Sequence, residues 1–118
     1  DRRIRLESWR NAQEQGQLAA ARMLGGTATH AAVPWFWSDQ FDAKLQIAGL
    51  NAGYDQVVTR PGSGAHSGSV WYYRDGRLIA VDALNDARAY MIGKRLIEGG
   101  KSPSPEAVTA AADLKALM

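Results

Sequence analysis

Apolar residues recur at spacings of three and four over the first part of the chain, which is the pattern of an amphipathic helix. Ser8 is the expected N-cap, and Gly25-Gly26 ends the helix after about Leu24. Asn11 followed by Glu14 forms a second possible capping pair. The apolar stripe consists of Trp9, Ala12, Gly16, Ala19 or Ala20, and Met23. Because small residues dominate this stripe, we expect the helix to lie very close to a flat surface.

Residues 44–50, 55–60, 69–74 and 77–83 have the composition and alternation of β-strands. The last two flank Asp75-Gly76, the strongest short signal for a two-residue hairpin. This loop pairs Arg74 with Arg77 and, further along, Tyr72 with Ile79, Trp71 with Ala80, and Val70 with Val81. The bulky Trp71 opposite the small Ala80 supports this register.

A second amphipathic helix is predicted from a cap at Asn85 or Asp86 to a stop at Gly99-Gly100. Its buried face is expected to comprise Ala89, Ile92, Gly93, Leu96 and Ile97. Ser104-Pro105 begins a short final helix or turn, with proline at the first helical position. The sequence therefore predicts an α+β domain, in which an antiparallel sheet of about four to five strands is flanked by helices.

The most informative segment is Val33-Pro-Trp-Phe-Trp-Ser-Asp-Gln40. In an extended chain Trp35 and Trp37 point to one face and Phe36 to the other. A continuous hydrophobic core would account for any one of these rings. The tryptophan pair, followed directly by polar residues, needs either a second hydrophobic layer or a flat aromatic ligand to cover it.

Length, composition and charge limit the class of protein and the partners that this chain can have. The 118 residues suffice for one domain with a core, and the hydrophobic and charged fractions of 46% and 22% are typical of soluble proteins. A membrane span needs about 18 consecutive apolar residues, and no apolar run in the sequence is that long. The net charge is +2 and the basic residues form no stripe, so no nucleic-acid partner is predicted. The absence of cysteine excludes thiolate metal sites and is compatible with the cytoplasmic location that we expect. The start lacks Met, so we expect a segment of a longer protein.

No complete active site can be recognised in the sequence. Gly62–Gly64 followed by Gly68 misses the dinucleotide fingerprint and leads into a strand rather than a helix. His30 and His66 have no partner at metal-ligand spacing, so no metal site is predicted. Asp82 is interpreted as a cap or a hydrogen-bond anchor. The residues therefore indicate part of a site rather than a complete one.

Two features could form such a half-site. The helix N-terminus at Glu7–Asn11 offers free amides and a positive dipole end. The residues Trp35–Trp37, hereafter the aromatic shelf, offer a flat apolar cover. A flavin ring needs both, since its N1–C2 carbonyl edge becomes negative on reduction. The residues alone therefore suggest a flavin-covering domain.

Several segments, in order along the chain, closely resemble the putidaredoxin reductase and Rieske dioxygenase reductase family of FAD-dependent NAD(P)H:ferredoxin reductases. They are residues 6–16, 33–40, 45–50 with 53–55, 73–78, 80–82 with Asn85, and 113–117. The Pro-Trp-Phe-Trp-Ser-Asp-Gln motif is highly specific. The resemblance implies that residues 1–26 are the last helix of the preceding FAD domain plus a linker, and that 27–118 form the C-terminal interface domain.

The same resemblance implies the roles of particular residues. Trp9 contacts the flavin and Trp37 lies beside it, with Trp35, Phe36 and Pro34 completing the flavin-contacting set. The parent protein would pass electrons from NAD(P)H through FAD to a [2Fe-2S] ferredoxin that serves a Rieske dioxygenase or a P450. Its upstream FAD and NAD domains are partners of this chain, and the isolated fragment is expected to be inactive.

Ferredoxin docking would use Trp37 and basic residues of the second helix, namely Arg88, Lys94 and Arg95. Met91 and Tyr90, one turn from Lys94, could form the apolar centre of that patch. Two other functions remain open from the residues. One is a non-catalytic interaction module that keeps the aromatic shelf without a flavin. The other is a dimerisation domain, as in the related disulfide reductases.

Overall fold

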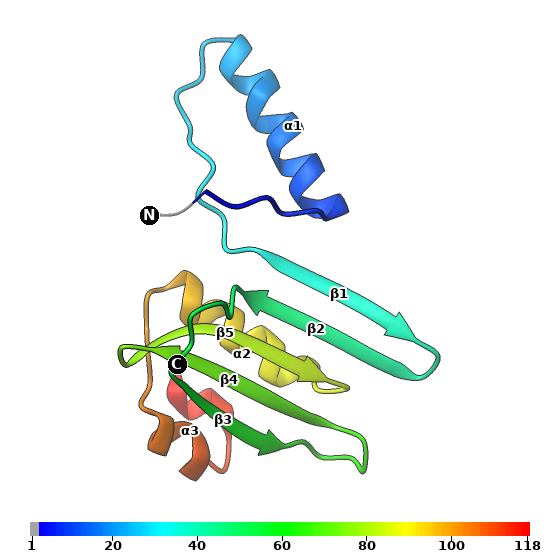
Figure 1. The fold of residues 1–118 in the computed structure, drawn as a ribbon, viewed down its shortest axis with the longest axis vertical. Helices are drawn as coiled ribbons and strands as arrows, with labels where there is room; N and C mark the ends of the chain where they lie inside the picture. Colours follow the sequence, from blue (N-terminus) through cyan, green and yellow to red (C-terminus); the bar gives the residue numbers. More distant parts are fainter. Residues whose placement is uncertain (1–2) are drawn as a thin grey trace.

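A computed structural model describes residues 3–118, which form one antiparallel sheet with helices around it. The elements are α1 (Trp9–Met23), β1 (Trp35–Gln40), β2 (Ala43–Gly49), β3 (Gln56–Pro61), β4 (Gly68–Arg74), β5 (Arg77–Leu84), α2 (Ala87–Glu98), α3 (Pro105–Ala110) and η1 (Leu114–Leu117). The strand order is β1-β2-β5-β4-β3. Helix α2 packs on β5, β2 and β4, and α3 packs on β3 (Figure 1). The predicted α+β class is confirmed, with five strands.

Side-chain caps begin the helices where the sequence places them. Ser8 Oγ accepts a hydrogen bond from the Asn11 amide at 3.1 Å, and Ser104 Oγ does the same for the Ala107 amide at 3.1 Å. Of the two candidates for α2, Asp86 is the cap, through a 3.1 Å bond from the Ala89 amide. Asn85 instead joins the start of β2 to the loop between β3 and β4, because its side chain accepts from the Lys44 amide at 2.8 Å and donates to the His66 carbonyl at 3.0 Å.

The β4–β5 hairpin follows the predicted register only at its start. Asp75 and Gly76 have φ values of +50° and +74°, as a type I′ turn requires. The observed pairs are Arg74–Arg77, Tyr73–Leu78, Tyr72–Ala80, Trp71–Val81 and Val70–Asp82. The predicted partners of Tyr72, Trp71 and Val70 are therefore wrong by one residue. The cause is a β-bulge, in which Ile79 is an extra residue of β5 without a partner in β4.

The bulge requires a glycine on the neighbouring strand. Gly49 of β2 lies opposite Ala80 and has a φ of +78°. A Cβ built on Gly49 would come 2.1 Å from the carbonyl oxygen of Ile79, a backbone atom that cannot move aside. The close approach of two backbones and the positive φ both exclude a side chain here.

The core lies between the sheet and α2. Its largest fully buried side chains are Trp71, Tyr73, Leu96, Val81 and Val108. The predicted buried face of α2 is confirmed, with Ile97 only partly buried and Tyr90 added to the face. Burial raises the pKa of the Tyr73 phenol to about 12, and its hydroxyl donates to the Pro103 carbonyl at 2.8 Å.

Helix α1 differs from the expectation. The predicted apolar stripe does not face the sheet, since Trp9 and Met23 at its two ends are 69% and 82% exposed. Figure 1 shows α1 standing apart from the sheet beyond β1. The side that is half-buried consists of Arg10, Asn11, Glu14 and Leu18, which face the linker and the start of β1. The small-residue stripe is therefore left without a partner in residues 3–118. Over the same residues, no helix has both the length and the apolar character needed to cross a bilayer.

We expect Gly49→Ala to lower the free energy of unfolding of this chain by at least about 2 kcal/mol, because the new methyl meets the Ile79 carbonyl and the backbone is strained. Gly16→Ala is the matched control, since a Cβ there has no atom within 4 Å. It should leave stability unchanged or raise it by up to about 1 kcal/mol through helix propensity. Urea unfolding followed by circular dichroism measures both, and equal effects of the two changes would contradict the bulge argument.

Candidate functional site

Strand β1 presents the aromatic shelf on two faces. Trp35 and Trp37 lie on the same face with ring centroids 5.3 Å apart, which confirms the predicted alternation. This is the face that α2 covers, because Trp35 lies opposite the buried Ala48 and 6.5 Å from the Tyr90 ring. Phe36 points to the uncovered face. Phe36 and Trp37 remain 47% and 41% exposed, so the shelf is only partly covered by this chain.

Two cations flank the indole of Trp35. The Arg10 guanidinium carbon from α1 lies 4.8 Å from the ring centroid, and the Lys94 ammonium from α2 lies 5.3 Å from it. Each cation is held by an acid one turn further along its own helix. Arg10 pairs with Glu14, and Lys94 lies 3.6 Å from a carboxylate oxygen of Glu98. Trp35 therefore links α1 and α2 to the sheet.

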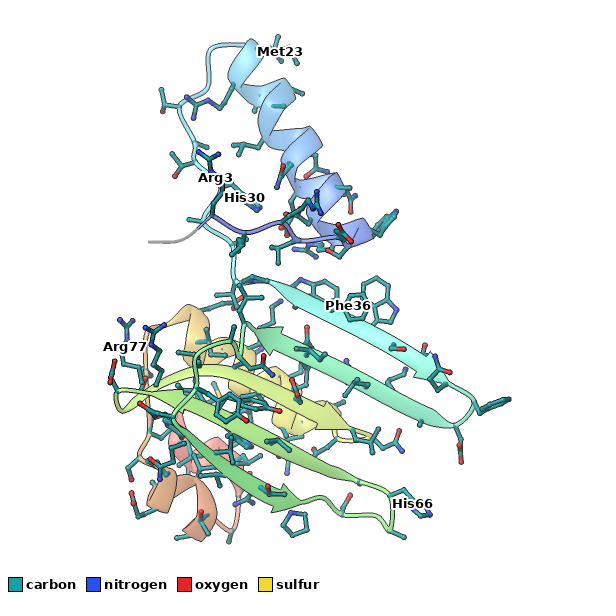
Figure 2. All side chains as sticks on the ribbon, in the orientation of Figure 1. Arg3, Met23, His30, Phe36, His66 and Arg77 are labelled. Carbon is teal, nitrogen blue, oxygen red and sulfur yellow. The ribbon has the colours of Figure 1, made fainter. Side chains whose placement is uncertain are left out.

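A cavity of about 210 Å³ lies between the start of α1 and the upper end of β1 and β2. Its walls come from the leader and first turn of α1, from His30 and Ala32 of the linker, and from both strands. Figure 2 shows Phe36 projecting from β1 and His30 between the linker and α1. The lining residues are Arg5, Leu6, Glu7, Ser8, Arg10, Asn11, Glu14, His30, Ala32, Pro34, Trp35, Phe36, Ile47, Gly49 and Leu50.

The structure brings together three of the five residues expected to contact a flavin. Pro34, Trp35 and Phe36 line the cavity, together with the first turn of α1. Trp9 and Trp37 are outside the lining, and both are well exposed. Trp35 Nε1 is buried and has no hydrogen-bond partner within the described part of the chain. A buried donor beside a cavity is a feature of a site that a ligand completes.

The basic residues of α2 do not form the single patch that the sequence suggested. Arg88 turns to η1, where it lies 3.7 Å from Asp113, whereas Lys94 turns to Trp35 on β1. Tyr90 is only 5% exposed and belongs to the core, so it cannot supply an apolar surface centre. Met91, at 46% exposure, is the apolar residue of α2 that does reach the surface.

Of the two interpretations of Asp82, the hydrogen-bond anchor is confirmed and the helix cap is wrong, since Asp86 caps α2. What the sequence did not reveal is its partner, Tyr72, on the uncovered face of the sheet. The Tyr72 hydroxyl donates to Asp82 Oδ2 at 2.9 Å. Burial raises the pKa of the Asp82 carboxyl, although the Tyr72 hydrogen bond opposes this. The other carboxylate oxygen, Oδ1, is buried without a partner in residues 3–118. Strand alternation could have revealed the pair, because Asp82 lies between Val81 and Ala83, whose side chains enter the core. In the same residues no cluster of acidic and histidine side chains could hold a metal.

The described residues thus form a cavity between α1 and the sheet, with a partly exposed aromatic shelf beside it. The chain belongs to the family of reductase C-terminal domains, whose model matches residues 35–118. The match begins at the first residue of the aromatic shelf and extends to the end of the chain. This finding confirms the resemblance drawn from the sequence motifs.

Individual relatives are ferredoxin reductases. A ferredoxin–NAD(P)(+) reductase of a Sphingomonas species is 50% identical over 80% of this chain, and putidaredoxin reductase of Pseudomonas putida is 38% identical over 82%. A crystal structure of a ferredoxin reductase from Rhodopseudomonas palustris matches 96% of this chain with 41% identity and a TM-score of 0.88. A covalent putidaredoxin reductase–putidaredoxin complex matches 99% with 34% identity and a TM-score of 0.89.

The chain spans about a quarter of the length of these relatives, with 23% of the Sphingomonas protein and 28% of the Rhodopseudomonas chain covered. The solved structures extend the match to α1, which the family model does not include. The arrangement of α1 beside the domain is therefore shared with solved reductases.

Replacing Arg10 by Met should detach α1 from Trp35, because the cation contact contributes about 0.5–1 kcal/mol and an isolated helix of this length is marginal in water. In NMR spectra of this chain, the indole N–H signal of Trp35 should shift and the amides of α1 should lose protection from exchange. The indole of Trp71, bonded to Ser69 Oγ at 2.9 Å, is an internal reference.

Gln13→Met, at an exposed position of the same helix, is the control variant for Arg10→Met and should change neither signal. If Arg10→Met also leaves the Trp35 resonance and the α1 protection unchanged, the guanidinium does not hold the helix.

Proposed function

We propose that this chain is the C-terminal domain of an FAD-dependent NAD(P)H:ferredoxin reductase, in which it covers the flavin and helps to dock the ferredoxin. The observation that carries the proposal is the cavity between the first turn of α1 and Pro34–Phe36. Its relatives, ferredoxin–NAD(P)(+) reductases by name, support this class of activity. The upstream FAD and NAD domains, absent from this sequence, complete the enzyme.

The residues around the cavity fit a flavin. Pro34 and Phe36 offer flat apolar contact, and the N-terminus of α1 offers a positive dipole end to a carbonyl edge. The unpartnered Trp35 Nε1 offers a hydrogen-bond donor beside the cavity. FAD, when bound, supplies the conversion of a two-electron hydride donor into single-electron transfers. The apolar side chains of the wall limit the access of water to that site, and the dipole of α1 favours negative charge there. Arg10 adds no net charge, because it is paired with Glu14 in the same lining.

The exposed Trp37 is the residue that we place on the ferredoxin side. It lies next to the shelf residues that line the cavity, yet outside the cavity itself. The partner would be a [2Fe-2S] ferredoxin that feeds a Rieske dioxygenase or a P450, and the covalent putidaredoxin complex of a structural relative supports a partner of this kind. Arg88, Lys94 and Arg95 are proposed contacts with an acidic ferredoxin, with Arg95 exposed and Lys94 half-buried over Trp35.

The domain division is also part of this proposal. We assign residues 1–26 to the end of the FAD domain with its linker, and 27–118 to the C-terminal domain. The exposed stripe of α1 supports it, because an apolar helix face that this chain leaves open is what an adjacent domain would cover.

The isolated chain should not retain FAD or reduce a ferredoxin with NAD(P)H, because one wall of a site leaves most flavin contacts unmade. The parent protein, extended upstream to the length of the relatives, should be yellow and active. Absorbance at the flavin bands and a ferredoxin-reduction assay on both proteins provide the test. A stoichiometric flavin on the purified 118-residue chain, or a full-length parent with neither flavin nor activity, would contradict the proposal.

Within the parent, Trp37→Ala should slow electron transfer to the ferredoxin at least about tenfold, which is the loss expected from a missing contact of about 1.4 kcal/mol. Flavin reduction by the nicotinamide should change little. Phe36→Ala is the matched variant, since Phe36 is equally exposed and adjacent but lines the cavity. It should instead weaken FAD retention. Stopped-flow measurement of the two half-reactions separates these outcomes, and equal losses in both for Trp37→Ala would count against its position on the ferredoxin side.

A further inference from the structure

A second cavity, hereafter the hairpin cavity, lies between the turn of the β4–β5 hairpin, the segment that follows α2 and the end of the linker. Its volume of about 520 Å³ is larger than that of the cavity beside α1. Sites for small molecules commonly have volumes of about 300–1,000 Å³. Figure 2 shows Arg77, one of the lining residues, projecting from the end of the hairpin. The hairpin cavity is therefore large enough to hold a small molecule.

Two arginines in its lining stand opposite each other. Arg74 and Arg77 are cross-strand partners on either side of the hairpin turn, and both side chains are exposed. Like charges in directly opposite positions destabilise a pair of strands. Neither arginine forms an ion pair with an acid in residues 3–118. An anion between the two guanidinium groups would remove their repulsion.

The charged side chains of the lining favour an anion as a whole. They are Arg74, Arg77 and Lys101 against a single acid, Asp75. Lys101 donates to the main-chain oxygen of Met118 at 2.7 Å, so the two arginines are the cations left for a ligand. Guanidinium groups bind carboxylates through pairs of parallel hydrogen bonds, which are both strong and directional. The lining thus offers a place for a carboxylate group.

The remaining wall of the hairpin cavity is mostly apolar. Ile79 contributes to it and is the extra residue of the β-bulge in β5. Bulges are frequent beside binding sites, because they redirect a side chain. Gly49, whose missing side chain leaves room for the bulge, lines the cavity as well. The other half-buried apolar residues of the wall are Val33, Pro34, Leu50 and Ile97.

We propose that the hairpin cavity is a binding site for a small organic carboxylate. Its carboxylate group lies between Arg74 and Arg77, and its apolar body packs on Ile79 and Ile97. Inorganic phosphate matches the arginines but has no apolar part to cover the wall. A neutral apolar molecule would cover the wall but leave the two arginines opposed. Only a ligand that combines the two properties satisfies both halves of the lining.

The hairpin cavity is distinct from the cavity proposed for the flavin, although the two share a wall. Pro34, Gly49 and Leu50 line both of them. None of the charged residues of the hairpin cavity lines the other one. The inference needs neither a flavin nor a ferredoxin, so it does not depend on the proposed function.

Calorimetric titration of the full-length parent tests the class of ligand, with FAD and NAD(P)⁺ in excess so that nucleotide sites are filled. Hexanoate is the probe, and we expect it to bind at one site per chain. Acetate keeps the charge without the apolar body, hexanamide keeps the body without the charge, and inorganic phosphate is a different anion. Each of these three should bind at least tenfold more weakly than hexanoate.

Three results would overturn the proposal. The first is the absence of saturable hexanoate binding. The second is binding of acetate or hexanamide as tight as that of hexanoate, because one half of the lining would then contribute nothing. The third is tighter binding of phosphate, which would make the pair of arginines a site for inorganic anions.

Variants of one arginine locate the site. Arg77→Gln should weaken hexanoate binding at least tenfold, and Arg77→Glu should abolish it. Lys44→Gln is the control, because Lys44 is an exposed cation outside the lining, and it should leave the affinity unchanged. Hexanoate binding that survives Arg77→Glu would show that the carboxylate does not lie between the arginines.

Thermal unfolding of the 118-residue chain separates a lost site from a damaged fold. Arg77→Glu places an acid opposite Arg74, so an attractive pair replaces a repulsive one and the melting temperature without ligand should rise. A rise together with lost binding supports the proposal. A fall in the melting temperature would contradict the repulsion between the arginines, on which the proposal rests.

Discussion

The indole of Trp35 is the point at which the separate parts of this molecule meet. It belongs to β1, packs against the core, and contacts one cation from α1 and another from α2. The two acids that hold these cations lie on the helices themselves, so each helix fixes its own contact. The position of the first turn of α1 relative to the sheet, and hence the shape of the cavity, depends on this one side chain. The same side chain thus makes a structural contact and lines the cavity.

The sheet divides the roles between its faces. The face under α2 holds the fully buried Trp71 and Tyr73, which give the domain a core of its own. The uncovered face of the sheet carries half-exposed apolar residues and Asp82, whose Oδ1 has no hydrogen-bond partner in residues 3–118. Strand alternation produces both at once, since neighbouring residues of a strand serve opposite layers. A domain built in this way can be stable in itself and still present a prepared surface to a neighbour.

Local signals in the sequence predicted most of the fold, because caps, turns and periodicity act over a few residues. Ser8, Asp75-Gly76 and Ser104 each satisfy or bend the backbone beside them, and each prediction at these positions is confirmed. The β-bulge was missed because it depends on Gly49, a residue of a different strand. The orientation of α1 was missed for a related reason. Its stripe predicted a close neighbour, and none of residues 3–118 supplies one.

At the candidate site, too, local sequence patterns did not reveal contacts between residues that are distant in the sequence. Motif and alternation located the aromatic shelf and the helix N-terminus, yet neither could show that Arg10 and Lys94 converge on Trp35 from different helices. Likewise the spacing of the basic residues on α2 predicted a single patch. In the structure Arg88 lies near Asp113 and Lys94 lies over Trp35, so the two cations point to different elements. A charge on a helix is directed by the nearest partner in space, and that partner is set by tertiary packing. Two buried polar atoms, Trp35 Nε1 and Asp82 Oδ1, have no hydrogen-bond partner in residues 3–118. Both stand where tertiary packing sets the surroundings, beside the cavity and on the uncovered face of the sheet, and local sequence patterns do not specify such surroundings.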